Sequence, residues 1–173
     1  MPHADTKNFI PLNIAVLTVS DTRTAETDTS GQLLTDLLKE AGHSAGERCL
    51  LKDDLYKIRA KVSQWIADET TQVVLITGGT GFSSRDGTPE AVLPLFDKIV
   101  DGYGELFRHF SYEEIGTSTM QSRAIAGLAN GTLVFCIPGS NNACKTAWDK
   151  IISEQLDSSH RPCNFVGELR HFD

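Results

Sequence analysis

Short apolar runs alternate along this chain with longer segments whose apolar residues recur at helical spacing. Unbroken apolar or β-branched runs at 14–19, 73–76 and 132–137 predict buried strands, and a weaker run at 47–51 predicts a fourth. Amphipathic helices are predicted at 33–41, at 55–66, from 88 onward, at 106–128 with breaks at Gly116 and Gly127, and at 141–156. This alternation predicts an α/β fold, with three layers (α/β/α) around a mostly parallel, mixed central sheet.

Several helix ends carry their own signals. Asp28 or Ser30 is the expected N-cap of the first helix, and Gly42 stands where that helix should stop. The segment 88–90 (Thr-Pro-Glu) combines a capping hydroxyl, a proline in the first turn and an early acid, so a helix is predicted to begin there.

The length of 173 residues fits one domain. We expect a single domain over 1–173, with a polar N-terminal arm at about 1–12 and an irregular C-terminal tail at about 157–173. The composition, 40% hydrophobic and 23% charged, is typical of a globular chain rather than of a disordered or fibrous one.

Charge limits the expected partners. Sixteen Lys and Arg against 23 Asp and Glu give a net charge of -7, the wrong sign for a nucleic-acid-binding surface. The longest apolar runs are far shorter than the roughly 18 residues of a membrane helix, so neither nucleic acid nor a membrane is an expected partner. A small anionic ligand is compatible with an acidic protein, because local backbone dipoles can hold it.

The cysteines and histidines show no metal-binding spacing. The four cysteines include no CxxC pair, and the five histidines form no HxH or HExxH pattern, so neither zinc nor a histidine base is predicted. The start of the chain, MPHADTKNFIPLN, carries no secretory pattern. We therefore expect a cytoplasmic protein with reduced cysteines.

Ligands of open parallel sheets bind where the loops after the strands gather. The strongest candidate is the loop at 77–87, which opens with TGGTG directly after a predicted strand. Gly78, Gly79 and Gly81 would let backbone N–H groups approach an anion, and Thr77 and Thr80 add hydroxyls. The alternative is a merely flexible turn, although eleven residues exceed the usual connection of about 4 to 6.

Two aspartates are candidates for metal binding. Asp86 ends the glycine-rich loop, and Asp53 follows another predicted strand, so both could face one cleft. Two carboxylates beside a phosphate repel it, and Mg2+ would resolve this because it binds carboxylate and phosphate oxygens together. The alternative is that each aspartate simply caps a helix.

The segment 139–146, GSNNACKT, nearly matches a phosphate-binding P-loop. Cys144 replaces the second glycine, where a P-loop must turn against the phosphates. The favoured interpretation is therefore a helix with Ser140 as its N-cap and Lys145 in solvent. Ser140 and Asn141 could still lend donors to a ligand.

Nearly the whole chain resembles the MoaB/MogA family of molybdenum-cofactor biosynthesis proteins. The motifs that carry the resemblance are VSDTRT at 19–24, DTSG at 28–31, LITGGTGFSSRDGTPEA at 75–91, GYGELFR at 102–108, SR at 122–123 and IPGSNNA at 137–143. The segments FIPLNIAVLTVSD, EEIGTSTMQSRAIAG and RPCNF resemble the MoaB branch in particular.

The resemblance implies a molybdopterin-binding domain that forms homotrimers, often paired into hexamers. It implies an adenylyltransferase that joins molybdopterin to the AMP part of Mg-ATP and releases pyrophosphate. Asp53 and Asp86 match the acidic, catalytic and Mg2+-binding positions of the family. The expected pocket residues are Ser20, Asp21, Thr77, Gly78, Gly79, Thr80, Gly81, Pro138, Gly139 and Ser140. The alternative is a non-catalytic molybdopterin-binding or carrier protein of the same pathway.

Overall fold

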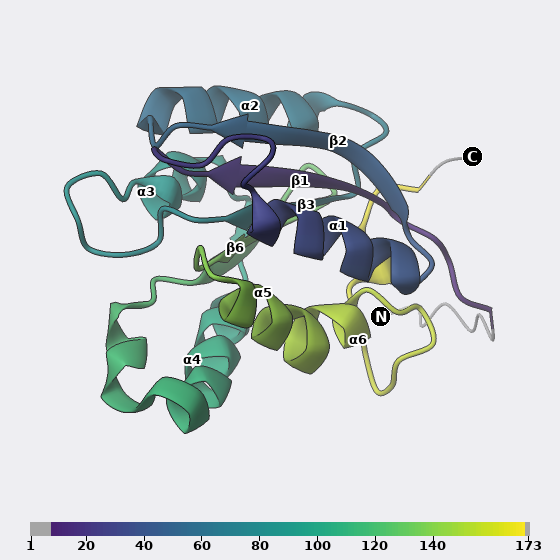
Figure 1. The fold of residues 1–173 in the computed structure, drawn as a ribbon. Coiled ribbons are helices and arrows are strands. Elements are labelled where there is room, and N and C mark those ends of the chain that lie inside the picture. Colours follow the sequence, from purple (N-terminus) through teal and green to yellow (C-terminus); the bar gives the residue numbers. More distant parts are fainter. Residues whose placement is uncertain (1–7, 172–173) are drawn as a thin grey trace.

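A computed structural model describes residues 8–171, in which one six-stranded sheet lies between two layers of helices (Figure 1). The strands are β1 (Asn13–Val19), β2 (Ser44–Leu51), β3 (Val73–Thr77), β4 (Lys98–Ile99), β5 (Ile125–Ala129) and β6 (Thr132–Ile137). The helices are α1 (Thr29–Glu40), α2 (Leu55–Ala67), α3 (Thr88–Val92), α4 (Asp101–Ile115), α5 (Asn141–Ala147) and α6 (Ser153–Gln155). The predicted three-layer α/β fold is confirmed.

The order of the strands places the carboxyl ends of three of them together. The sheet runs β2-β1-β3-β6-β5-β4, and the first four strands are parallel while β5 is antiparallel to both neighbours. Thr77 pairs with Thr18 on one side and with Ile137 on the other, so β1, β3 and β6 end at one level. Chain crossovers leave to opposite sides of the β1–β3 pair, which makes this edge the topological switch point.

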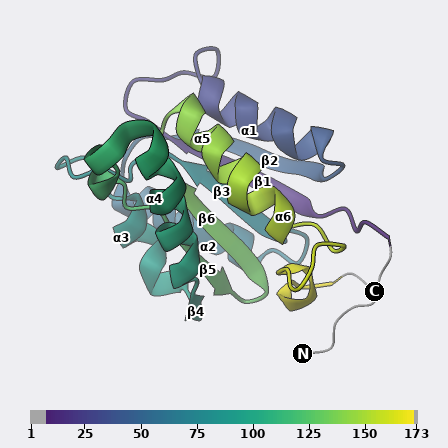
Figure 2. The same cartoon turned by 90° about the horizontal axis from the view of Figure 1, so that it is seen from below.

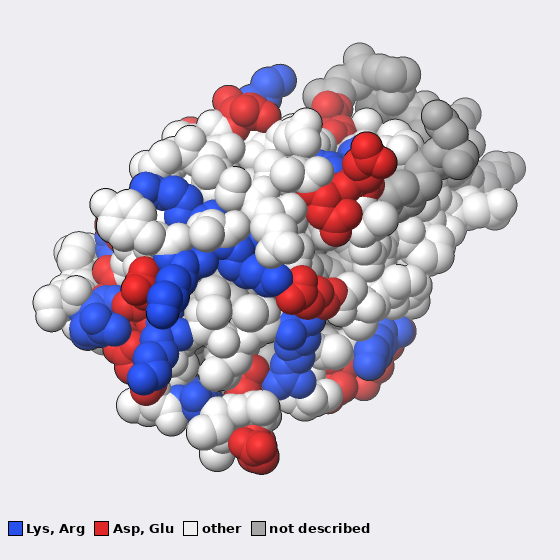
Figure 3. All heavy atoms as spheres, turned by 90° about the horizontal axis from the view of Figure 1, so that it is seen from above, with Lys and Arg blue, Asp and Glu red and all other residues white. Residues whose placement is uncertain are grey.

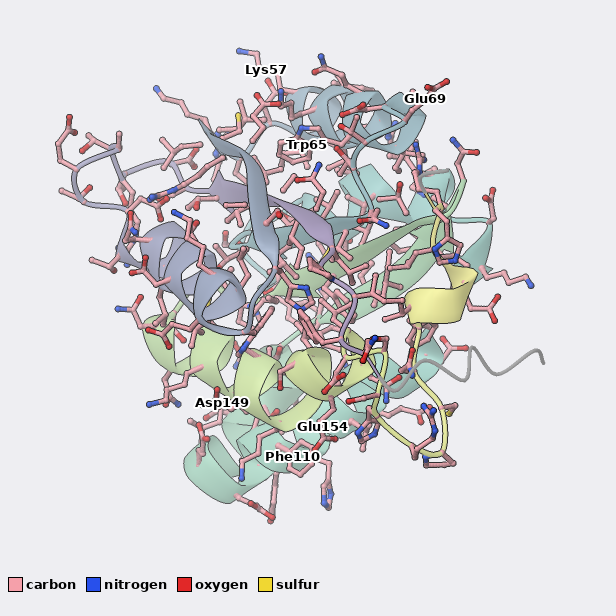
Figure 4. The ribbon with its side chains drawn as sticks, turned by 90° about the vertical axis from the view of Figure 1, so that its right-hand side faces the viewer. Lys57, Trp65, Glu69, Phe110, Asp149 and Glu154 are labelled. Atoms are coloured by element: carbon pink, nitrogen blue, oxygen red, sulfur yellow. The ribbon has the colours of Figure 1, made fainter. Side chains whose placement is uncertain are left out.

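Each face of the sheet carries its own core. Ile14 and Val16 of β1 pack on the side of α1, α4 and α5, whereas Ala15 and Leu17 pack on the side of α2 and α3. This alternation is expected of a strand that is covered on both faces. Figure 2 shows α1, α4 and α5 across the first face, and Figure 4 shows Trp65 and Phe110 on opposite sides of the sheet. No helix within residues 8–171 is long and apolar enough to cross a membrane.

The prediction of a broken helix at 106–128 is wrong in part. Helix α4 begins earlier, at Asp101, and a 3-10 turn (Gly116–Gln121) leads into strand β5, which was not predicted. Small residues gave β5 little apolar signal. Gly127 stands in this strand because a Cβ there would lie 2.2 Å from the ring of Phe96.

The helix N-termini resolve the open alternatives. Asp28, not Ser30, caps α1 by accepting the N–H of Gly31, and Ser140 caps α5 as predicted. Thr88 does not cap α3: it is the first residue of that helix, and its hydroxyl donates to the carbonyl of Gly78 at 2.8 Å. Thr88 therefore fastens the base of the glycine-rich loop.

The predicted last helix is interrupted by a π turn at Trp148–Ile152 between α5 and α6. After α6, residues 157–171 hold only a short 3-10 turn (Val166–Glu168), yet Val166 and Leu169 are buried in the core. Of the expected N-terminal arm, residues 1–7 lie outside the described residues, as do 172–173 of the tail.

Candidate ligand-binding site

A cavity of about 420 Å³ opens at the carboxyl ends of β1, β3 and β6. This volume is within the range of small-molecule sites. Its lining comes from the end of β1, the glycine-rich loop, the turn after α4 and the turn after β6. The lining residues are Val19, Gly78, Gly79, Thr80, Gly81, Asp86, Ser118, Gln121, Ser122, Pro138 and Gly139.

The backbone around Gly78 leaves no space for a side chain. The φ of this glycine is +104°, and a Cβ would stand 2.1 Å from the carbonyl oxygen of Val19. A Cβ on Gly139 would lie 3.1 Å from the Cα of Gly78. The backbones that follow β1, β3 and β6 therefore meet without side chains between them, and the N–H of Gly78 donates to Ile137 at 2.9 Å.

The next two glycines face carboxylates. A Cβ on Gly79, whose φ is +68°, would stand 2.8 Å from Oδ2 of Asp53, and a Cβ on Gly81 would stand 2.8 Å from Oδ2 of Asp86. The absence of these two side chains lets both carboxyl groups lie against the loop backbone. The structure thus brings Asp53 and Asp86 to the same loop, and Asp86 lines the cavity.

The surroundings of Asp53 disfavour its ionised form. Burial raises its pKa to about 6, and the nearby charge of Asp86 adds to the rise. The N–H of Gly87, which donates to Oδ1 of Asp53 at 3.2 Å, opposes this shift. A cation bound nearby would stabilise the ionised form of this carboxylate.

Neither aspartate is a helix cap. Asp54 caps α2 by accepting the N–H groups of Tyr56 and Lys57, and the N-cap of α3 is Gly87, which has no side chain. The capping alternative for Asp53 and Asp86 is therefore wrong. Asp86 instead accepts the N–H of Ser83 at 2.9 Å, which closes a turn inside the loop.

The two carboxylates are compatible in number and chemical type with a Mg2+ site. Within residues 8–171, no three His, Cys, Asp or Glu side chains gather as a metal-binding group. Zinc and calcium sites usually take more protein ligands than two, whereas Mg2+ is commonly held by one or two carboxylates together with substrate phosphates and waters. The residues available for such an ion are Asp53 and Asp86.

Asp21 lies beside the cavity rather than in its lining. Its carboxylate accepts two hydrogen bonds from Arg85, at 2.9 and 3.0 Å, and one from the backbone N–H of Asp53 at 3.1 Å. The bonds to Arg85 lower the pKa of Asp21 to about 2. Asp21 thus joins the loop after β1 to the tip of the glycine-rich loop and to the turn before α2.

The other expected pocket residues divide into two groups. Thr80 and Pro138 line the cavity, whereas Thr77 lies beneath it, fully buried, with its hydroxyl donating to the carbonyl of Pro138 at 3.2 Å. Ser20 and Ser140 use their hydroxyl oxygens as acceptors within their own turns, from Arg23 and Ala143 respectively.

One wall of the cavity was not predicted. Ser118, Gln121 and Ser122 follow α4 and face the glycine-rich loop across the cavity. The Ser122 hydroxyl oxygen is buried and has no hydrogen-bond partner within the described part of the chain. The sequence signal was present as the polar run GTSTMQSR, but nothing in its pattern placed it against the loop.

Arg123 ties this wall to the loop. Its backbone N–H donates to Thr80 at 3.1 Å, and its Nε donates to the carbonyl of Gly81 at 2.9 Å. The guanidinium also contacts Glu90 and stacks on the ring of Phe82, 5.2 Å from its centroid. These contacts connect the turn after α4 to the glycine-rich loop.

The near P-loop is an ordinary helix start. Helix α5 begins at Asn141, and the N–H of Cys144 donates to the carbonyl of Ser140 at 3.0 Å, as in a helical first turn. The Cys144 thiol is buried beside Thr77 at 3.3 Å. The segment therefore cannot wrap around a phosphate as a P-loop does, as the cysteine indicated.

Fold and cavity together define an α/β/α protein with a glycine-lined cavity at the switch point of the sheet, where proteins of this class bind their ligands. A family model described as "Probable molybdopterin binding domain" matches residues 15–158. Molybdenum cofactor biosynthesis protein B of Escherichia coli (strain K12) is 58% identical over 162 residues, or 94% of this chain and 95% of that protein. The namesake from Bacillus subtilis (strain 168) is 47% identical over 142 residues, covering 82% and 84%.

Solved structures agree. A crystal structure of molybdenum cofactor biosynthesis protein B has a TM-score of 0.82 and 48% identity, over 85% of this chain and 92% of that one. The tungsten cofactor synthesizing protein MoaB from Pyrococcus furiosus has a TM-score of 0.75 and 37% identity, over 83% and 92%. The chain belongs to this molybdopterin-binding domain family of molybdenum cofactor biosynthesis proteins, and the resemblance to MoaB and MogA is confirmed.

Proposed function

We propose that the protein binds molybdopterin and adenylylates it with Mg-ATP. In this reaction a phosphate oxygen of molybdopterin attacks the α-phosphorus of ATP, the bond to the β-phosphate oxygen breaks, and pyrophosphate leaves. The observation that carries the proposal is the position of Asp53 and Asp86, whose carboxylates lie against Gly79 and Gly81 of the loop that lines the cavity.

The residues of the chain mainly bind and orient the reactants. The glycine-lined loop presents backbone to the phosphates, while Ser118, Gln121 and Ser122 supply polar groups on the opposite wall. Asp53 and Asp86 would hold Mg2+, which when bound would neutralise phosphate charge. A phosphate nucleophile is already ionised near pH 7, so the site needs no side chain as a general base. Catalysis then rests on proximity and electrostatics.

We also propose that the protein works as a homotrimer or homohexamer in the cytoplasm, where ATP is available. Exposed apolar side chains on α4 and in the turn after it support an assembly through this region. These residues are Leu106, Tyr112, Ile115 and Met120.

The test is incubation of the purified protein with molybdopterin and Mg-ATP, followed by measurement of pyrophosphate. We expect pyrophosphate and adenylylated molybdopterin in equal amounts, and no release without molybdopterin. Molybdopterin binding without pyrophosphate release would instead identify a non-catalytic binding protein of the pathway.

A further inference from the structure

Several carboxylates lie around the glycine-rich loop beside the cavity. Asp53 and Asp54 act on the guanidinium of Arg85 together with Asp21, and Asp86 lies within the same loop. A protein cation at this edge would offset the repulsion between these carboxylates and a phosphorylated ligand. Figure 3 shows that Lys and Arg form a band on the face covered by α2, with acidic side chains beside them, although the net charge is negative.

Three arginines lie in or beside the loops around the cavity, and they differ in their hydrogen-bond partners. Arg123 donates to backbone carbonyls of the glycine-rich loop and contacts Glu90, so it is part of the loop's support. Arg23 donates to Thr27 and Thr29 within its own loop. Arg85 instead points both its Nε and its Nη2 at one carboxylate, that of Asp21.

The Asp21–Arg85 pair is exposed and easily exchanged. The side chains of Asp21 and Arg85 are 35% and 62% exposed, and water weakens an ion pair that is exposed to this degree. A phosphate offers a guanidinium the same two-oxygen edge as a carboxylate, with more charge. A phosphoryl group can therefore replace Asp21 at little cost.

We propose that Arg85 is a phosphate-binding residue of the site and that Asp21 holds it in place until a phosphoryl group takes over its two donors. This inference rests on the proposed function and names a further binding residue for it. Asp21 keeps its hydrogen bond from the N–H of Asp53 when Arg85 leaves, so the exchange does not release the turn that carries Asp53.

If a phosphoryl group replaces Asp21, substitutions of the two partners of this ion pair should change ligand affinity in opposite directions. Binding is measured by calorimetry with Mg-α,β-methylene-ATP, whose bridging group cannot be cleaved, and separately with molybdopterin. R85M should weaken binding of the phosphorylated ligand that Arg85 contacts by about tenfold or more. D21N removes the competing charge, and its Oδ1 still accepts from Asp53, so binding should tighten by up to about fivefold. The ligand that shows both effects is the source of the phosphoryl group.

Two controls separate exchange from general electrostatics. D54N removes one negative charge near Arg85 and preserves the cap of α2, so its gain in binding should be smaller than that of D21N. In the R85M background, D21N should bring no gain. Equal gains from D54N and D21N, or a D21N gain that persists in R85M, would overturn the inference, as would weaker binding in both single variants.

Pyrophosphate release on the same samples keeps the two proposals apart. Turnover by the wild type with unchanged ligand binding in R85M refutes the role of Arg85 alone. The predicted binding pattern without pyrophosphate from any variant leaves Arg85 as a phosphate ligand and refutes adenylylation. A wild type that binds neither probe overturns both. Thermal unfolding of each variant confirms that it is folded.

Discussion

The carboxylate of Asp28 meets the guanidinium of Arg48 at 2.9 Å, with 1% of the aspartate side chain exposed. The same carboxylate caps α1 through the N–H of Gly31 at 2.9 Å and accepts the hydroxyl of Thr18 at 2.8 Å. A Cβ on Gly31 would stand 2.3 Å from Oδ2 of Asp28. The DTSG motif at 28–31 is therefore explained by the start of α1, behind the loop that carries Asp21.

Removal of the Asp28 carboxylate should destabilise the folded protein. D28A leaves Arg48, Thr18 and the N–H of Gly31 without their shared acceptor, so the free energy of unfolding should fall by about 2 to 4 kcal/mol. Urea unfolding measures it. D36A, on the exposed side of the same helix, should cost less than about 0.5 kcal/mol. Equal losses in the two variants would contradict the account.

G79A should damage the site. The φ of +68° is unfavourable for alanine, and the new Cβ would lie 2.3 Å from the Thr88 hydroxyl and 2.8 Å from Asp53. We expect a loss of roughly 2 kcal/mol in stability and a clear loss of ligand affinity. The matched control is G102A on α4, where a Cβ meets nothing within 4 Å. Unchanged ligand affinity in G79A would show that the carboxylates need not lie against this loop.

The pH dependence of stability should report Asp53. Its folded pKa, about 6, exceeds the ordinary value of 3.8, so the folded protein binds this proton more tightly and the stability that the group contributes at low pH is lost as the pH rises from about 4 to 6. D53N, which cannot ionise, should therefore gain on the wild type by about 1 to 2 kcal/mol at pH 8 and show no gain at pH 4. The full pKa difference between 3.8 and about 6 would correspond to about 3 kcal/mol in the free energy of unfolding. The expected gain is smaller because solvent screens the partly exposed carboxylate.

This comparison is made by urea unfolding in the presence of a chelator. Addition of Mg2+ at pH 8 should then stabilise the wild type and stabilise D53N less. A difference in stability between D53N and the wild type that does not change with pH would contradict the raised pKa of Asp53.

His43 should act in the opposite pH direction. It is buried, its Nδ1 accepts the N–H of Leu12 at 3.1 Å, and burial lowers its pKa below 6.5, although Asp157 opposes the shift. The unfolded chain therefore binds this proton more readily, and stability is lost as the pH falls below about 6.5. H43N keeps a side-chain acceptor without the titration, so its unfolding free energy should fall less than that of the wild type between pH 7 and pH 5.5. Parallel profiles would exclude a role for His43.

Hydrophobic periodicity clearly predicted three of the four parallel strands, β1, β3 and β6, because they are buried on both faces and their sequences are unbroken apolar runs. It failed at β5, where Gly127 packs against Phe96 and the strand gains its stability from its neighbours rather than from its own side chains. Local sequence preferences cannot report such a contact.

The site shows the same division. The TGGTG loop and Asp86 could be placed from the sequence because glycines and an acid follow a buried strand. The Ser118–Ser122 wall and the bonds from Asp21 to Arg85 and to the Asp53 amide depend on how loops distant in sequence meet, which no local pattern records.

The most direct measurement is pyrophosphate release from molybdopterin and Mg-ATP by the wild type, D86N and D149N, with molybdopterin binding determined on the same samples. Asp149, which is exposed and lies on the opposite side of the sheet from α2, provides the matched control (Figure 4). The account predicts that the wild type and D149N release pyrophosphate, whereas D86N binds molybdopterin nearly as well and releases at least about a hundredfold less. Equal pyrophosphate release by D86N would contradict it.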